Sequence, residues 1–178
     1  MSLKSKWLFI ILGDDRTGKT ALQKKILKLI SGENRDNRLD CNEVFSITHP
    51  YLIRKMETIS FSNRSFQEKK DIYFTIEQYF SSHFKIADLC IISSHLVLED
   101  VEQMISYGHK MFLNVCGIFM SNSIALNPEK NAQISLLDWD FRICSDNPLT
   151  EISDQQDNQL QKIADSFIQM LIQRTLIG

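Results

Sequence analysis

The chain lacks the charge and the long apolar runs that would direct it to nucleic acid or into a membrane. Its formal net charge is only −2, which gives no general reason to expect nucleic acid or an anionic membrane as a partner. No apolar run approaches the roughly 20 residues that a helix needs to span a bilayer. We therefore expect a cytoplasmic protein with no membrane or nucleic-acid partner.

The sequence also lacks the spacing of a metal-bound or disulfide-linked fold. Its four cysteines contain no C-x-x-C pair, and three of them lie in apolar runs where a thiol behaves as a small buried hydrophobic group. Its four histidines show no ligand spacing. We expect neither a zinc site nor disulfides from these residues, which are Cys41, Cys90, Cys116, Cys144, His49, His83, His95 and His109.

A chain of 178 residues is long enough for one domain with a substantial core. Apolar residues make up 43% and charged residues 24%, as in an ordinary globular protein. With no repeat and no linker visible, we expect residues 1–178 to form one domain.

One stretch carries a recognisable motif. Residues 13–20 match G-x-x-x-x-G-K-T in full, after the apolar run 7–12 and before a helical pattern over 21–30. A glycine-bounded loop between a strand and a helix is the context of a phosphate-binding loop.

Each residue type in this loop has a physical role. Gly13 and Gly18 allow sharp bends, so that backbone N–H groups and the helix N-terminus can face phosphate oxygens. Lys19 can reach the outer phosphates, and the Thr20 hydroxyl can ligate the accompanying Mg²⁺. The residues expected to contact the nucleotide are Gly13, Asp14, Asp15, Arg16, Thr17, Gly18, Lys19, Thr20 and Ala21.

Strand-like and helix-like segments alternate along the chain, which favours an α/β fold with a parallel sheet covered by helices on both faces. The expected core strands are 7–12, 44–48, 88–94, 111–120 and 138–144. The expected helices are 19–31, 65–84, 98–107 (capped by Gly108) and 155–174, with a polar loop around Asn127-Pro128. The alternation in 56–61 is compatible with an additional strand at an edge of the sheet.

On the motif at 13–20 and this element order, the chain resembles the P-loop nucleoside triphosphatases, and among them the small kinase branch. The resemblance implies a three-layer fold whose mainly parallel sheet has five strands in the order 2-3-1-4-5, with 88–94 beside 7–12. It also implies that the chain binds ATP or GTP with Mg²⁺, and of the two we expect ATP.

The sequence departs from this family where the third core strand ends. The family usually places an acidic residue there, whereas this chain has Ser93-Ser94-His95, and Asp88 lies at the other end of the strand. The N-K-x-D and D-x-x-G patterns of regulatory GTPases are absent, and no arginine-rich lid is recognisable. Metal-assisted turnover is therefore less well supported than nucleotide binding.

A kinase needs cations for the transferred group, because phosphoryl transfer depends on positioning and charge neutralisation. We take Lys19 and Arg64 as the candidate catalytic residues, with Arg16 as a further cation. His95 is expected near the phosphates, with a structural role as the alternative. Asp15 and Asp40 are weaker candidates for a general base, and Asn147 for a contact to the base or ribose.

Three functions remain open from the sequence. The leading hypothesis is a nucleoside triphosphate-binding protein that transfers the γ-phosphoryl group to a small molecule. The alternative is a slowly hydrolysing switch or scaffold whose bound nucleotide orders a surface for a protein partner. A degenerate fold without nucleotide is the third, and the intact motif at 13–20 speaks against it.

Overall fold

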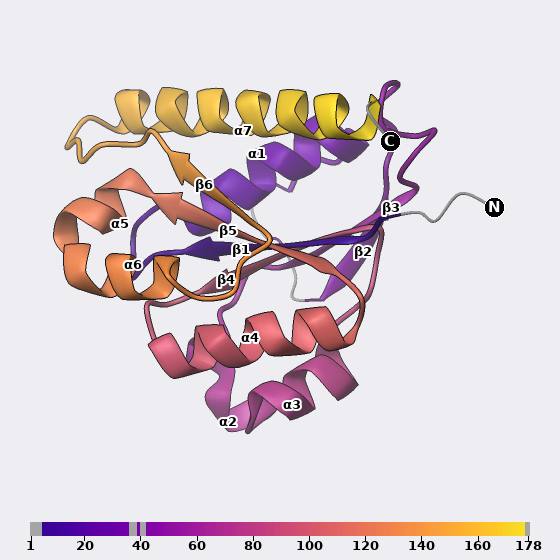
Figure 1. The fold of residues 1–178 in the computed structure, drawn as a ribbon. Coiled ribbons are helices and arrows are strands. Elements are labelled where there is room, and N and C mark those ends of the chain that lie inside the picture. Colours follow the sequence, from indigo (N-terminus) through magenta and orange to yellow (C-terminus); the bar gives the residue numbers. More distant parts are fainter. Residues whose placement is uncertain (1–4, 36–38, 40–41, 177–178) are drawn as a thin grey trace.

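The computed structural model describes residues 5–35, 39 and 42–176. In it, a six-stranded sheet in the order β2-β3-β4-β1-β5-β6 lies between two layers of helices (Figure 1). The strands are β1 (Trp7–Leu12), β2 (Glu43–Ser46), β3 (Thr58–Ser62), β4 (Leu89–Ser94), β5 (Asn114–Met120) and β6 (Phe141–Ser145). The longer helices are α1 (Lys19–Ser31), α4 (Leu98–Lys110) and α7 (Ser153–Leu176).

Shorter helical segments complete the chain. Between β3 and β4 lie the 3-10 turn η1 (Gln67–Lys69), α2 (Lys70–Tyr73), α3 (Ile76–Gln78) and the π-helical turn η2 (Tyr79–His83). Between β5 and β6 lie α5 (Ser121–Leu126) and α6 (Pro128–Ser135). Among the described residues, no helix combines the length and the apolar character needed to cross a bilayer.

The strands at the centre of the sheet have the expected neighbours, whereas those at the β2 edge do not. β1 pairs in parallel with β4 on one side and β5 on the other, which confirms the predicted neighbour of 7–12. The predicted five-strand order is wrong because β3, expected at an edge, lies between β2 and β4. β3 runs parallel to β4, whereas β2 pairs antiparallel with β3 and so makes the sheet mixed.

Hydrogen bonds of Asp88 explain why β3 lies beside β4. Its carboxylate accepts the backbone N–H of Glu57 at 2.7 Å and of Thr58 at 3.2 Å, and its own N–H donates to Thr58 Oγ1 at 3.2 Å. These bonds hold the start of β3 to the start of β4. The residue noted at the far end of the third core strand therefore helps to fix the register of β3 against β4.

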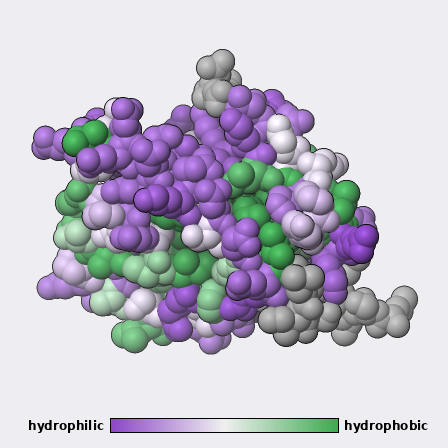
Figure 2. Space-filling view, turned by 90° about the horizontal axis from the view of Figure 1, so that it is seen from above, coloured by the Kyte–Doolittle hydropathy of each residue, from purple (hydrophilic) through white to green (hydrophobic). Residues whose placement is uncertain are grey.

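Side chains of β1 alternate between two separate cores, as expected for a strand covered on both faces. Phe9 and Ile11 face α1 and α7, while Leu8, Ile10 and Leu12 face α4 and the segments α2 to η2. Phe9 meets Phe167 of α7 edge-on, with ring centroids 4.8 Å apart. From above, the α7 side of the molecule is mostly hydrophilic, with hydrophobic patches between the polar residues (Figure 2).

Two helix predictions need correction. The expected helix over 65–84 is broken at Phe74, where a tight turn with positive φ (56°) ends α2 and the Thr75 N–H donates to Tyr73 O at 2.6 Å. Thr75 then caps α3 by accepting the N–H of Gln78. Gly108 does not end its helix but lies inside α4. A Cβ at Gly108 would lie 2.6 Å from Val115 Cγ2, so glycine is needed there for close packing of α4 on β5.

The region around Asn127-Pro128, predicted to be a polar loop, is helical. Proline suits the first turn of a helix because its missing N–H would have no helical partner there, and α6 begins at Pro128. The Asn131 side chain then donates to Asn127 O at 2.9 Å and to Ser123 O at 3.1 Å, which ties α6 to α5.

Candidate functional site

The loop at 13–18 joins the carboxyl end of β1 to α1 with the backbone bends that its motif predicts. Gly13 N–H donates to Ser94 O at 3.2 Å, so the loop starts beside the end of β4. Arg16 (φ 62°) and Gly18 (φ 95°) have left-handed backbone, and α1 begins at Lys19. Left-handed residues in such a turn direct neighbouring N–H groups to one side, where they can bind an anion.

Lys19 is buried and bound to its own loop. Its Nζ donates to Gly13 O at 2.6 Å and to Asp14 O at 2.7 Å. Burial lowers the pKa of Lys19, and the negative charges of Glu68, Asp15 and Asp14 oppose this shift only in part. A buried ammonium group whose charge is costly gains from a bound anion.

Three asparagines hold the loop from the β5–β6 side. Asn122 and Asn147 both donate to Thr17 O, at 3.1 and 3.4 Å, and Asn127 donates to Asp14 Oδ2 at 2.9 Å. Asn147, considered for the base or ribose, is buried, and its Oδ1 accepts the N–H of Ser121. The structure thus gives Asn147 a bracing contact to the loop.

Behind the loop, the end of β4 carries a neutral cluster. The buried Gln23 of α1 donates through Nε2 to Ser62 O and to Ser93 Oγ, both at 3.1 Å. These bonds join α1 to the ends of β3 and β4. At the end of β4, where the resemblance predicts an acid, this chain has the Ser93 hydroxyl, bonded to the Gln23 amide of α1.

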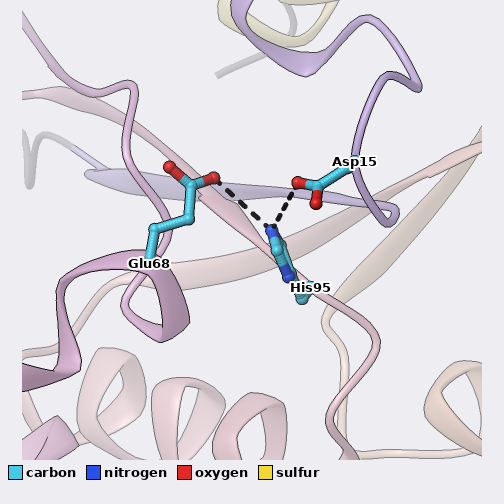
Figure 3. Close-up of side chains that lie close together, drawn as sticks. All are labelled: Asp15, Glu68 and His95. Atoms are coloured by element: carbon cyan, nitrogen blue, oxygen red, sulfur yellow. Dashed lines mark ion pairs between the residues drawn. The ribbon is translucent and has the colours of Figure 1, made fainter.

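The acid that reaches the loop comes from η1. Glu68, whose backbone N–H donates to Ser65 Oγ at 3.3 Å, lies with Asp15 and His95 in front of the loop (Figure 3). Arg64, the predicted catalytic cation, forms an ion pair with Glu68 at 3.0 Å and its side chain is 58% exposed. The structure therefore brings Arg64 to this group, but as the partner of a carboxylate.

The remaining predicted residues are placed as follows. Thr20 and Ala21 lie exposed in the first turn of α1, and Arg16 is exposed at the tip of the loop. His95 lies near the loop as expected, while Asp15 contacts it from the loop side. Asp40 lies outside the described residues.

We expect Gly18→Ala to destabilise the fold more than Gly32→Ala. Both glycines have left-handed backbone, in which an L-residue costs about 1–2 kcal/mol. Only at Gly18 would the added Cβ also press on Leu160 of α7, at 3.2 Å, whereas nothing lies within 4 Å at Gly32. Urea unfolding of both variants measures the difference, and equal losses would contradict the contact between the loop and α7.

Comparison with known proteins gives little guidance. No family model matches the chain, and no curated protein matches it. One solved structure is similar, a de novo designed P-loop fold protein determined by NMR in solution. It has 14% sequence identity and a TM-score of 0.39, with 93% of this chain and 96% of the designed chain covered.

Proposed function

We propose that this protein binds a nucleoside triphosphate with Mg²⁺ at residues 13–21, with ATP preferred to GTP. The β- and γ-phosphates would lie in the loop, on the N–H groups that precede α1. Lys19 would contact the outer phosphates, and Thr20 would ligate the Mg²⁺ ion.

The position of Lys19 is the observation that carries this proposal. Its ammonium group lies at the start of a 13-residue helix, in a loop with left-handed bends at Arg16 and Gly18. In place of a counter-ion, it has the carbonyl oxygens of Gly13 and Asp14, at 2.6 and 2.7 Å. A phosphate would add negative charge to that of the nearby acids, which offset the desolvation of this cation only in part.

In the kinase form of this proposal, Lys19 and Arg64 stabilise the transferred γ-phosphoryl group. Arg64 would first have to leave Glu68, to which it is bound at 3.0 Å. Because the pair is partly exposed, exchange of one anion for another at Arg64 costs little. Phosphate transfer to a panel of small metabolites tests this form.

The neutral cluster of Gln23 and Ser93 favours a second candidate, a nucleotide-dependent switch. Without an acid at the end of β4, no carboxylate from that strand orients the attacking water, so turnover would be slow. The bound triphosphate would then act by ordering a surface for a protein partner. Slow hydrolysis together with partner binding that depends on nucleotide would support this candidate over the kinase.

Thr20→Ala tests the predicted place of Mg²⁺. We expect at least a roughly ten-fold loss of ATP affinity when Mg²⁺ is present, which corresponds to about 1.4 kcal/mol. In EDTA, wild type and Thr20→Ala should bind ATP equally weakly, since the hydroxyl acts through the metal. Titration calorimetry measures all four affinities, and a loss of the same size in EDTA would mean that Thr20 does not bind the metal.

A further inference from the structure

Three side chains from different parts of the chain converge in front of the loop. Asp15 follows β1, Glu68 follows β3 and His95 follows β4, so all three lie beyond the carboxyl ends of strands in one sheet (Figure 3). His95 Nε2 lies 3.4 Å from Asp15 Oδ1 and 3.4 Å from Glu68 Oε1. The three potential ligand atoms all lie within 4.8 Å of one another.

These distances are long for hydrogen bonds. A protonated histidine bound to a carboxylate usually has an N–O distance of about 2.7–2.9 Å. His95 Nε2 is inaccessible to solvent and has no hydrogen-bond partner among the described residues. A buried nitrogen without a hydrogen bond is unfavourable, and here it points between two carboxylates that lie 3.4 Å away.

The two distances from His95 Nε2, both 3.4 Å, also fit a shared metal ion. Tetrahedral zinc with bonds of about 2.0–2.1 Å sets its ligand atoms about 3.3–3.4 Å apart. Octahedral Mg²⁺, with bonds of similar length, would bring adjacent ligands to about 2.8–3.0 Å and favours oxygen donors. One imidazole and two carboxylates are donors that zinc accepts.

Two of the three proposed ligands, Glu68 and His95, also have second contacts. Arg64 binds Glu68 Oε2 at 3.0 Å, which leaves Oε1 directed to His95. Gln67 Oε1 accepts the backbone N–H of His95 at 3.2 Å, and Gln67 Nε2 donates to Ser94 Oγ at 3.2 Å. Such contacts fix the orientation of metal ligands and strengthen binding.

We propose that Asp15, Glu68 and His95 form a Zn²⁺ site in front of the phosphate loop, with a fourth position open to water or another oxygen ligand. This site does not depend on nucleotide binding. The spacing of histidines and cysteines along the sequence gave no sign of it, because its ligands are separated by 53 and 27 residues and meet only through the parallel pairing of β1, β3 and β4.

The site would change the charge around Lys19. Asp15 and Glu68 are two of the three acids whose charges act on Lys19. With both carboxylates bound to Zn²⁺, the mouth of the loop would lose the negative charge that repels an approaching anion.

The test uses the nucleotide-free full chain after removal of metals. We expect wild type to bind one Zn²⁺ tightly in competition with a chromogenic chelator, and His95→Gln, Glu68→Gln and Asp15→Asn each to bind it at least about ten-fold more weakly. Arg64→Ala should weaken binding less than these three, because it removes a contact that only positions Glu68.

His109→Gln is the matched control. His109 also faces two carboxylates, Asp140 from Nε2 at 3.0 Å and Asp138 from Nδ1 at 3.9 Å, but from opposite ring nitrogens that cannot bind one ion together. The zinc affinity of His109→Gln should equal that of wild type. Thermal unfolding without metal checks that every variant is folded.

Several results would overturn the proposal. They are the absence of tight zinc binding to folded wild type, unchanged affinity in His95→Gln, and an equal loss in His109→Gln. Co²⁺ bound to wild type gives an independent measurement. A thiolate-to-cobalt charge-transfer band would place the ion on a cysteine and reject the site, whereas tetrahedral Co²⁺ without that band supports it.

Discussion

Phe9→Ala should lower the free energy of unfolding by about 3–5 kcal/mol, the usual cost of removing a fully buried phenylalanine. Phe9 is fully buried in the central strand of the sheet, and its ring meets Phe167 of α7 edge-on. The substitution therefore removes packing on the α7 side and leaves a cavity. In a domain of this size the melting temperature should fall by about 6–20 °C.

Phe112→Ala is the control for Phe9→Ala, because Phe112 is the same residue type and is 92% exposed. Its unfolding free energy should stay within about 0.5 kcal/mol of wild type. If Phe9→Ala cost less than about 1 kcal/mol, β1 would not be the strand between the two cores.

Asp88→Ala should cost about 2–4 kcal/mol. The Asp88 carboxylate accepts two backbone N–H groups, hydrogen bonds to a charged group contribute about 1.5–3 kcal/mol each, and two bonds to one shared acceptor do not add in full. Asp88→Asn keeps an acceptor oxygen and should cost clearly less. Asp138→Ala, at a side chain that is 98% exposed, serves as the control and should change little. Denaturant unfolding compares the three variants.

A loss in Asp88→Ala no greater than in Asp138→Ala would contradict the role assigned to Asp88. In that case the bonds to Glu57 and Thr58 would not determine where β3 pairs. Hydrogen exchange at the N–H groups of Glu57 and Thr58 separates this local effect from general loss of stability: both should exchange faster in Asp88→Ala than in a variant of equal stability elsewhere.

The elements that the sequence predicted best are those whose signal is local. The apolar run at 7–12 and the helical pattern that begins at Lys19 gave β1 and α1 with the observed bounds. The two glycines of the motif likewise predicted a sharp bend between them. In these cases the residues that determine the structure are close in sequence.

The errors arose where a contact between residues far apart in the sequence determines the structure. An alternating segment such as 58–62 predicts a strand but not its neighbours, and the contact that places it comes from Asp88, 30 residues later. The apolar stripe over 65–84 predicted one helix because periodicity does not register the tight turn at Phe74. The helix at Pro128 was missed because Asn-Pro was interpreted only as a turn, although proline also begins helices.

The same distinction holds for the candidate site. The residues of the loop follow from the motif, whereas the contacts of Glu68 with His95, Gln23 with Ser93 and Asn122 with Thr17 span 27 to 105 residues. The position of Glu68 in η1, shortly after β3, would have been a usable signal. It required knowing that β3 lies inside the sheet, parallel to β4.

The most direct test of nucleotide binding is thermal unfolding of wild type and Lys19→Ala with ATP, GTP and their diphosphates in Mg²⁺. Ligand at about 100 times its dissociation constant should stabilise wild type by roughly 2.7 kcal/mol. That corresponds to a rise of about 5–10 °C in melting temperature. We predict this rise in wild type, larger with ATP than with GTP, and its loss in a folded Lys19→Ala variant. No rise with any nucleotide in a well-folded sample, or an equal rise in both proteins, would contradict nucleotide binding by this loop.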